Sequence, residues 1–524
     1  MENAGNAVPG SLEYWALQKP DEAAIIEGGA SLTWKEWNRQ ANQLAHALAQ
    51  MGLKKNDIAA VRTQTRMEWF VANRALTKLG CSTLTVNWRL TPSELRYMLE
   101  DSGAKALIFD DPDPSVIVNE LKDINLKGWI TMDQDKAVEG THRFEDLVAG
   151  NDAPERFASQ QRPPRILYTS GTTGKPKGVY LPEELLKKRR KEIAEYLEDL
   201  AKRTAVDLKE TRTLLTLPLH HGAGPNAAER AHAKGNLVVL LRKYDAEKAL
   251  QLIDRYKITN WPTVPTMLSR LSALPIETLE KYDVSSLRLL SSGAAPFPAT
   301  LKKWLIDYFG PDCLYESYGS SETGLVTLMT PDQFSKKLES SGKPYKHVYI
   351  SVRDEEGNEL PPGETGELWI KTPLTIERYL NREALGRDSL DENGYFRVGD
   401  VGYVDEEGYL YITDRKKDMI ISGGVNIYPA EIEAVLLKHP GILDAAVIGI
   451  PHDDFGEQVM AVCEKRQNSQ VDVEELLQFC AQELASYKRP RIIKFVDELP
   501  RNAMGKILKK KLKEPYWKER EKHI

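Results

Sequence analysis

One short segment of the chain carries the side chains and the glycines needed to hold a negatively charged group. It reads YTSGTTGKPKG, runs from 168 to 178, and contains three glycines, four Ser or Thr hydroxyls and two lysines. Glycines let backbone N–H groups turn inward at positive φ, hydroxyls donate hydrogen bonds, and a lysine adds charge, which together suit a phosphate group. On composition alone a mobile polar turn is an equal alternative, because Gly, Ser and Thr are ordinary loop residues.

The named phosphate-binding patterns do not fit this segment. Walker A requires GxxxxGK followed by Ser or Thr, yet Gly174 and Lys175 are followed by Pro176, and Thr169 stands five residues before Gly174. The segment also lacks GxGxxG. The sequence therefore predicts an anion cradle that is neither a P-loop nor a dinucleotide-binding turn.

Seven further segments with chemically useful side chains follow in order. Taken singly, Asp400 reads as a turn residue, Arg415 as a surface charge, Glu322 as a helix cap and Lys506 as one solvated lysine in a basic tail. The segments are PLHHGAG (218–224), LLSSGAAP (289–296), ESYGSSETG (316–324), GELWIK (366–371), YFRVGD (395–400), ITDRKKDMIISGG (412–424) and LPRNAMGKI (499–507).

In this order and spacing the segments resemble the adenylate-forming family, which includes acyl-CoA synthetases, luciferases and the adenylation domains of peptide synthetases. The resemblance covers nearly the whole chain. It implies an α/β fold, with a large N-terminal domain (1–416) of helix-flanked β-sheets plus a small β-barrel-like part. It also implies a small mobile α+β C-terminal domain (417–524) that carries the catalytic lysine, with a hinge near Lys417.

The resemblance implies a site for ATP. Asp400 matches the aspartate that accepts hydrogen bonds from both ribose hydroxyls, and Arg415 matches the arginine that assists it. The glycine-rich loop would hold the β- and γ-phosphates through Thr169, Ser170, Gly171, Thr172, Thr173, Gly174 and Lys177. The adenine side would be lined by Gly293, Glu316, Ser317, Tyr318, Gly319 and Ser321.

Three catalytic residues are implied in the same way. Lys506 matches the lysine that bridges the reacting carboxylate and the α-phosphate, and Glu322, with Thr173, matches the holder of Mg²⁺. His221 fits the histidine beside the acyl pocket, although a core histidine is an equal reading of it alone. The glycine-containing run Ser422, Gly423 and Gly424 would face the thiol-bearing arm of coenzyme A.

The implied reaction has two steps. A carboxylate and ATP give an acyl adenylate and pyrophosphate, and the CoA thiol then gives the thioester and AMP. An enzyme that loads an acid onto a carrier protein is the nearest alternative, and an ATP-binding relative without turnover is another. The chain ends 18 residues after Lys506 with no carrier domain, and PLHHGAG lacks an acidic residue for an amino acid, which favours CoA.

The acid itself is constrained only by the expected pocket. Its positions are mixed in size and mostly apolar, and no cation stands out for a second substrate carboxylate. We therefore expect a monoacid of medium or long chain, or an aromatic or alicyclic one. The positions are His221, Gly222, Trp261, Val264, Pro265, Gly293, Gly319 and Leu325.

These residues must be positioned by helices and strands that alternate along the first part of the chain. A helical stripe over 37–51, a β-branched run over 58–61 and a second stripe over 69–79 predict βαβ units. From Val348 onward, acidic residues followed by glycine separate short alternating runs, which predicts hairpins. After Asp414, a helical stripe at Ile432, Val435 and Leu436 predicts a small α+β domain.

The sequence departs from the family just after the phosphate loop, ahead of the charged segment 183–210, because Val179 is followed by YLPEE where the family commonly has a Thr-His pair. Pro182 and two glutamates instead predict a helix start. Leu186, Ile193, Leu197 and Leu200 recur at helical spacing, so KKRRK (187–191) is expected on a helix with one apolar face. A solvated face is the simpler reading, and a basic surface for a partner is the other.

Composition limits the partners and the compartment. The 524 residues include 71 Lys and Arg against 77 Asp and Glu, so a net charge of −6 gives no reason to expect nucleic acid or an anionic membrane. Four scattered cysteines read as buried thiols of a reducing compartment. No leader or membrane span is evident, so we expect a cytoplasmic protein. The sequence leaves open whether the protein forms a homodimer.

Overall fold

A computed structural model describes residues 7–132, 138–150, 153–156, 163–169, 175–204, 210–422, 425–452, 455–502 and 505–521. The chain forms two compact units. The first consists of residues 1–193, 206–262 and 376–385, and the second of residues 194–205, 263–375 and 386–524.

The first unit alternates helices and strands, as the βαβ pattern predicts. Its helices are α1 (Leu12–Gln18), α2 (Trp34–Gln50), α3 (Met67–Leu79), α4 (Pro92–Ser102), α5 (Pro114–Leu121), α6 (Phe144–Val148), α7 (Glu183–Lys188), α9 (Ala223–Ala233) and α10 (Ala246–Tyr256). Its strands are β1 (Ala23–Glu27), β2 (Ala30–Thr33), β3 (Ile58–Arg62), β4 (Ser82–Val86), β5 (Ala106–Phe109), β6 (Gly128–Thr131), β7 (His142–Arg143), β8 (Ile166–Thr169), β9 (Lys177–Val179), β10 (Arg212–Leu215), β11 (Leu237–Leu240) and β12 (Asn260–Pro262).

The second unit is richer in antiparallel strands. Its helices are α11 (Pro265–Ser272), α12 (Ile276–Leu279), α13 (Ala299–Phe309), α14 (Pro331–Lys337), α15 (Pro429–Leu436), α16 (Val473–Glu483) and α17 (Lys509–Glu521), and α8 (Arg190–Arg203) runs into it from the first unit. Its strands are β13 (Leu289–Gly293), β14 (Leu314–Ser320), β15 (Gly324–Met329), β16 (Lys343–Pro344), β17 (Tyr349–Arg353), β18 (Gly366–Lys371), β19 (Phe396–Val404), β20 (Leu410–Arg415), β21 (Ile420–Ser422), β22 (Val425–Ile427), β23 (Ile442–His452), β24 (Gly456–Lys465) and β25 (Ile492–Val496).

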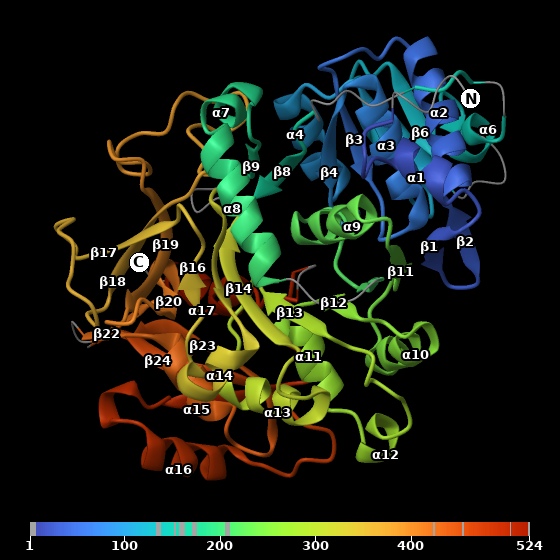
Figure 1. The fold of residues 1–524 in the computed structure, drawn as a ribbon. Coiled ribbons are helices and arrows are strands. Elements are labelled where there is room, and N and C mark those ends of the chain that lie inside the picture. Colours follow the sequence, from blue (N-terminus) through green and yellow to red (C-terminus); the bar gives the residue numbers. More distant parts are fainter. Residues whose placement is uncertain are drawn as a thin grey trace. The chain divides into compact units, whose positions relative to one another are not determined.

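A seven-stranded sheet in the order β7-β6-β5-β3-β4-β8-β9 forms part of the first unit. Its strands are parallel except for the β8–β9 hairpin. Helices α3 and α4 lie against these strands (Figure 1). Parallel strands of this kind are covered on both faces, and β4 (STLTV) and β5 (ALIF) are accordingly buried throughout. The same unit also pairs its strands in the order β12-β10-β11-β1-β2.

Three groups of strands organise the second unit. Strands β16-β15-β14-β13 lie side by side in that order. Strands β17 to β20 form a four-stranded antiparallel sheet in chain order, where the sequence predicts hairpins and a small barrel-like part. The last group has the order β22-β21-β24-β23, with β25 parallel to β24.

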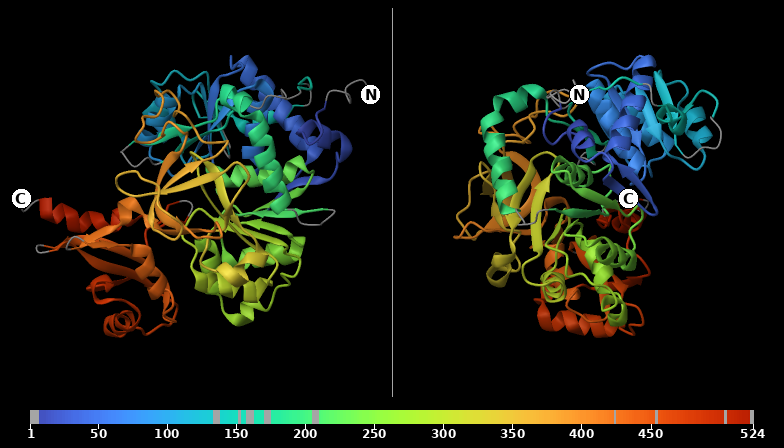
Figure 2. Two further views of the ribbon diagram at one scale, coloured as in Figure 1. Left: turned by 60° about the vertical axis from the view of Figure 1, so that its left-hand side comes forward. Right: turned by 45° about the vertical axis from the view of Figure 1, so that its right-hand side comes forward.

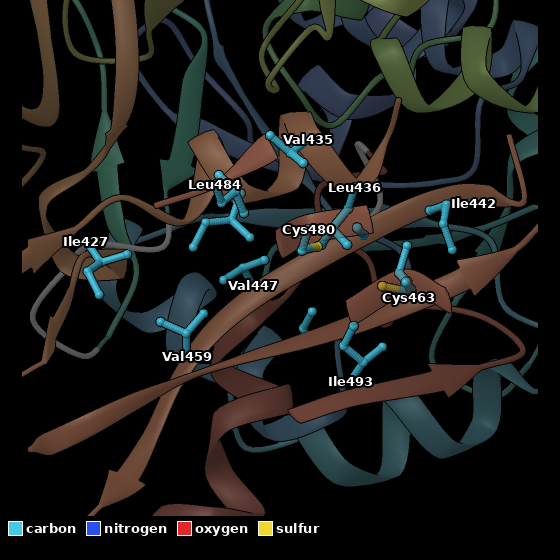
Figure 3. Packing of buried hydrophobic residues seen from close by; sticks show 14 of the residues in the cluster. Ile427, Val435, Leu436, Ile442, Val447, Val459, Cys463, Cys480, Leu484 and Ile493 are labelled. Atoms are coloured by element: carbon cyan, nitrogen blue, oxygen red, sulfur yellow. The ribbon is translucent and has the colours of Figure 1, made fainter. Parts of the chain in front are cut away.

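The last group of strands has a hydrophobic core of its own. Ile432, Val435 and Leu436, the stripe that the sequence singles out, are buried on α15. They pack with residues of β23, β24 and α16, including the thiols of Cys463 and Cys480 (Figure 3). Figure 2 shows these orange and red elements as a lobe of sheet and helices. A separate core is what allows such a lobe to act as a domain.

The charged segment forms two helices rather than one. Helix α7 ends at Lys188 and α8 begins at Arg190, so KKRRK spans the break between them. Leu200 and Tyr196 are buried on α8, whereas Leu197 is 49% exposed, so its assignment to the apolar stripe is wrong. Tyr196 takes that place because its ring packs on Tyr345 and its hydroxyl donates to the Leu325 carbonyl at 2.8 Å.

All four cysteines are free and buried, as predicted. Among the residues that the structure describes, no helix is long and apolar enough to cross a membrane.

Candidate active site

The side chains of Tyr318, Asp400 and Arg415 meet in the second unit. The Tyr318 hydroxyl donates a 2.6 Å hydrogen bond to Asp400 Oδ2, and Arg415 Nε lies 3.2 Å from Asp400 Oδ1. Asp400 is 6% exposed, so its carboxylate is held almost out of water. Burial, and then the charge of Asp400, raise the pKa of Tyr318 well above its ordinary value, so its proton stays on the hydroxyl.

Strand pairing explains why these side chains meet. Asp400 on β19 lies directly opposite Arg415, the last residue of β20, so the hairpin places the carboxylate beside the guanidinium group. Tyr318 comes from β14, which is far from the hairpin in the chain. The carboxylate keeps lone pairs free after accepting from Tyr318, since each oxygen can accept two hydrogen bonds. It can therefore accept further hydroxyl donors, as the ribose assignment requires.

Lys506 lies in the same electrostatic neighbourhood. Burial, followed by the positive charge of Arg415, lowers its pKa to about 8, against the opposing effect of Asp400. A half-buried ammonium group beside an arginine and an aspartate is suited to meet an anionic ligand, because the ligand relieves the repulsion between the cations. The structure thus brings Lys506 together with Asp400 and Arg415.

Two glycines let strands approach one another closely at this site. A Cβ added to Gly293, at the end of β13, would lie 2.1 Å from the carbonyl oxygen of Ser317 on β14. A Cβ added to Gly319 would lie 2.2 Å from the carbonyl oxygen of Gly324. Only glycine fits either position, so these residues shape the backbone around Tyr318.

Glu316, two residues before Tyr318 on β14, is buried against a lysine. Its Oε2 lies 2.6 Å from the Nζ of Lys302 on α13, and its Oε1 accepts a 3.3 Å hydrogen bond from Ser341 Oγ. Lys302 also donates to the carbonyls of Leu338 at 2.9 Å and Ser340 at 3.2 Å. Burial raises the pKa of Glu316, and the lysine opposes that effect. The pair occupies the interior of the unit.

Glu322 and Ser321 stand in the turn between β14 and β15. Glu322 is half-buried and Ser321 exposed; Thr323 N–H donates to Ser320 Oγ at 3.2 Å, which closes the turn. A strand follows, so Glu322 does not cap a helix. Within the described ranges, no group of three or more His, Cys, Asp or Glu could hold a metal ion. Mg²⁺ shared with a nucleotide needs only one or two carboxylates, so Glu322 fits that use.

In the first unit, the strands that flank the phosphate loop are tied down at both ends. Tyr168 donates to Asp101 Oδ2 at 2.7 Å, and Tyr97 donates to the Pro176 carbonyl at 2.9 Å. Thr169 ends β8 opposite Lys177 on β9, whose Nζ lies 5.1 Å from the ring centre of Tyr379. The predicted loop residues Ser170, Gly171, Thr172, Thr173 and Gly174 lie outside the described residues.

The two histidines of PLHHGAG lie just before α9 in the first unit, with ring centres 5.1 Å apart. Burial lowers the pKa of His221 to about 4. Burial, then His221 and Arg89, lower the pKa of His220 to about 3. Both imidazoles are therefore neutral at physiological pH.

The expected pocket positions are divided between the units: His221, Gly222 and Trp261 belong to the first, and Val264, Pro265, Gly293, Gly319 and Leu325 to the second. Ser422 ends β21 opposite Gly456 of β24. Gly423 and Gly424 lie outside the described residues.

Sequence reasoning missed the partners of these residues. Lys302 belongs to no motif, and nothing in its spacing links it to Glu316. Tyr318 is named from the sequence, but its bond to Asp400 is not. Asn502, which the sequence analysis does not single out, accepts from the Lys506 N–H at 2.9 Å through its side chain. An asparagine four residues before a functional lysine, within a turn, is the signal that could have found it.

Comparison with known proteins identifies relatives along the chain. A family model described as AMP-binding enzyme matches residues 12–380, and one described as AMP-binding enzyme C-terminal domain matches residues 431–506. A 2-succinylbenzoate–CoA ligase of Bacillus licheniformis is 36% identical over 516 residues, which cover 96% of this chain and 99% of that protein. A long-chain-fatty-acid–CoA ligase of Mycobacterium tuberculosis is 33% identical over 96% of this chain and 97% of its own.

A solved structure has the same fold. The o-succinylbenzoate CoA synthetase of Bacillus subtilis, bound to its acyl-adenylate intermediate, has a TM-score of 0.80 and 31% sequence identity, and covers 97% of this chain and 98% of its own. The same enzyme bound to ATP and a magnesium ion gives a TM-score of 0.79 at 31% identity, over 96% of this chain and 99% of its own.

Proposed function

This chain belongs to the family of AMP-binding enzymes, and we propose how its own residues carry out acid–CoA ligation. Its activity is the ATP-dependent ligation of a carboxylic acid to CoA through an acyl adenylate. ATP, Mg²⁺ and CoA take part in that reaction. The observation that most directly supports the assignment of roles is the meeting of Tyr318, Asp400, Arg415 and Lys506.

Asp400 holds the ribose of ATP. A buried carboxylate already fixed by Tyr318 and Arg415 is preorganised to accept two ribose hydroxyls, and charge-assisted hydrogen bonds of this kind are the stronger ones. Gly293, Glu316, Ser317, Gly319 and Ser321 line the adenine side, Glu316 through its backbone, because its carboxylate is paired with Lys302 in the interior. The narrow backbone approaches at Gly293 and Gly319 support that role, because a flat ring needs a wall without protruding side chains.

Lys506 serves the first step. The acid and the α-phosphate are both anions, so their approach must be neutralised, and a cationic Lys506 beside Arg415 supplies that charge where it develops. The carboxylate attacks phosphorus, the bond to the β-phosphate oxygen breaks, and pyrophosphate leaves. No protein nucleophile is needed, since the acid itself attacks.

Glu322, with Thr173, would hold Mg²⁺. The bound ion would neutralise the phosphate oxygens during the transfer. Thr169 to Lys177 cradle the leaving β- and γ-phosphates. The hydrogen bonds of Tyr168 and of the Pro176 carbonyl, on either side of this loop, support that role.

The second step uses the C-terminal domain, for which we propose the boundaries 1–416 and 417–524. The link at Lys417 lies in the short helical turn Lys416–Asp418 between β20 and β21, a connection between elements of the kind that can absorb a hinge rotation. After rotation the run Ser422, Gly423 and Gly424 faces the CoA thiol, which attacks the acyl carbon and releases AMP.

The acid is a monoacid of medium or long chain, or an aromatic or alicyclic one. His221 lies beside it, and as a neutral, buried imidazole it offers no cation to a second carboxylate. One relative is named for 2-succinylbenzoate, which has two carboxylates, and another for long-chain fatty acids, which have one. The relatives therefore differ in whether the acid carries a second carboxylate. The neutral histidine pair favours the monoacid.

We further propose a cytoplasmic location, supported by four free buried cysteines, and keep a homodimer as the assembly to be measured by sedimentation.

A panel of acids tests the function. Octanoate, palmitate, benzoate, cyclohexanecarboxylate and 2-succinylbenzoate are each incubated with ATP and Mg²⁺, with and without CoA, and AMP release is measured. We expect CoA-dependent AMP release with at least one monoacid. AMP release that needs a carrier protein in place of CoA would contradict the ligase assignment, and a preference for 2-succinylbenzoate would contradict the monoacid.

A further inference from the structure

Among the residues that the structure describes, Gly505 in the turn that carries Lys506 lies directly against Thr266 of α11. Gly505 has φ +73°, and a Cβ built on it would lie 2.0 Å from Oγ1 and 3.0 Å from Cβ of Thr266. Real Cβ atoms do not approach so closely. The backbone at Gly505 therefore rests directly on the Thr266 side chain, and any larger residue must push the turn away.

Hydrogen bonds join the described residues of this turn to one another. Asn502 N–H donates to the Lys506 carbonyl, and Gly505 N–H donates to the Asn502 carbonyl, each at 2.9 Å. The Asn502 side chain accepts from the Lys506 N–H, also at 2.9 Å. Arg501 donates to the Gly505 carbonyl at 3.2 Å and is itself paired with Asp444 at 2.8 Å. A shift imposed at Gly505 is therefore passed on to Lys506 rather than absorbed within the turn.

The position of this turn decides what Lys506 meets. In the structure Lys506 is half-buried, and Arg415 and Asp400 act on its charge. The exposed pair Arg270–Glu498 also links α11 to this segment, at 2.8 Å, but exposed pairs contribute little. The close approach of Gly505 to Thr266 thus sets the distance between α11 and the turn that carries Lys506.

We propose that Thr266 and Gly505 are positioning residues for Lys506, and that Asn502 transmits their contact to the lysine. The proposal rests on the role of Lys506 in adenylation given above. Relieving an overlap from 2.0 Å to an ordinary contact displaces the turn by about 1 Å or more, and a misplacement of about 1 Å can cost roughly 10²-fold in rate.

The test uses three variants of the full chain. Gly505→Ala introduces the overlap. Gly505→Ala with Thr266→Ala removes Oγ1 and leaves the Thr266 Cβ position, 3.0 Å away, as the nearest atom. Gly408→Ala is the matched control, because Gly408 has φ +83° and nothing within 4 Å of its added Cβ. It carries similar backbone strain without a clash.

The first readout is ATP–pyrophosphate exchange with the best acid of the panel. Gly505→Ala should lower kcat by ~10² with KM for ATP within about twofold, because the ribose contacts are untouched. The double variant should regain at least about tenfold, and Gly408→Ala should match the wild type. Normal exchange by Gly505→Ala, or no gain in the double variant, would overturn the proposal. So would a parallel loss of melting temperature and ATP affinity, which indicates a folding defect.

The second readout needs no acid substrate. Competitive acetylation at several pH values, with the modified peptide quantified by mass spectrometry, gives the pKa of Lys506. In Gly505→Ala this pKa should rise from about 8 toward 10.5, as the ammonium leaves its buried place beside Arg415. An unchanged pKa overturns the proposal. If Lys506→Ala exchanges normally, the proposed role of Lys506 fails instead, and the acetylation result still decides whether the contact positions the lysine.

Discussion

The hydroxyl of Tyr318 donates a 2.6 Å hydrogen bond to Asp400 Oδ2, linking two residues 82 positions apart in the chain. The bond fixes the plane of a carboxylate that Arg415 approaches from its other oxygen at 3.2 Å. A carboxylate held at both oxygens does not have to be ordered when a nucleotide arrives, so less entropy is lost on binding.

Tyr318→Phe should therefore weaken ATP binding. The substitution removes one hydrogen bond to a charged group, and such a bond contributes about 1.5–3 kcal/mol. Because water can partly take the place of the Tyr318 hydroxyl, we expect a loss of about tenfold in ATP affinity. Isothermal titration with ATP measures it. Tyr403→Phe, on the same strand as Asp400 but stacked on Tyr411, should bind as the wild type does. Unchanged affinity in Tyr318→Phe would mean that Arg415 alone orders Asp400.

Lys506→Ala should slow adenylation selectively. Loss of one preorganised electrostatic contact costs ~10²- to 10³-fold in rate. Thioester formation from a preformed acyl adenylate should hardly change, because no charge then has to be neutralised at phosphorus. Pyrophosphate exchange measures the first step, and CoA consumption with added adenylate measures the second. An equal loss in both steps would argue against a role confined to adenylation.

The pH dependence of adenylation follows from the lowered pKa of Lys506. The lysine is cationic below its pKa of about 8, so kcat/KM for ATP should be highest below pH 8 and fall up to tenfold per pH unit above it. In the ATP complex the phosphates stabilise the ammonium form of Lys506, so kcat should begin to decline at a higher pH than kcat/KM does. Lys506→Arg, which stays charged, should lack this decline. A profile that falls in the wild type and the arginine variant alike would assign the titration to another group.

Much of the site follows from the sequence because its residues sit in local patterns. Asp400 and Arg415 belong to two motifs that fold as one hairpin, so their meeting requires only strand register. The contacts between Thr266 and Gly505, and between Lys302 and Glu316, depend on how distant elements pack. No periodicity encodes such contacts. Leu197 shows the same limit, since Tyr196, its neighbour on α8, is buried in its place.

Glu322→Gln should raise the Mg²⁺ requirement. An amide is a weaker ligand for a hard cation than a carboxylate, and a difference of ~1.4 kcal/mol would raise the half-saturating Mg²⁺ concentration about tenfold. Exchange rates measured over a range of Mg²⁺ concentrations check this expectation. Glu406→Gln, at an exposed turn, is the control. An identical Mg²⁺ dependence in both variants would remove Glu322 from metal binding.

The acid should bind without help from a histidine cation. With a pKa of about 4 for His221 and about 3 for His220, both rings are neutral above about pH 5. KM for the acid should accordingly be flat between about pH 5.5 and pH 7, below the range in which Lys506 titrates. His221→Gln, neutral and similar in size, should keep that flat profile. A KM that rises steeply between pH 6 and pH 7 in the wild type alone would show that an imidazolium holds the substrate.

Removing one partner of the buried Lys302–Glu316 pair should lower the stability of the protein strongly, whereas removing both charges should lower it little. Lys302→Met leaves the Glu316 carboxylate buried without its cation, which destabilises a protein by roughly 3–5 kcal/mol. Lys302→Met with Glu316→Gln removes both charges, and the amide can still pair with Ser341, so most of the loss should return. Melting temperatures report both effects. Lys187→Met breaks an exposed pair with Glu183 and should change little. If the double variant melts as low as the single one, the cost comes from lysine packing against Phe297 and Phe334 rather than from an unpaired charge.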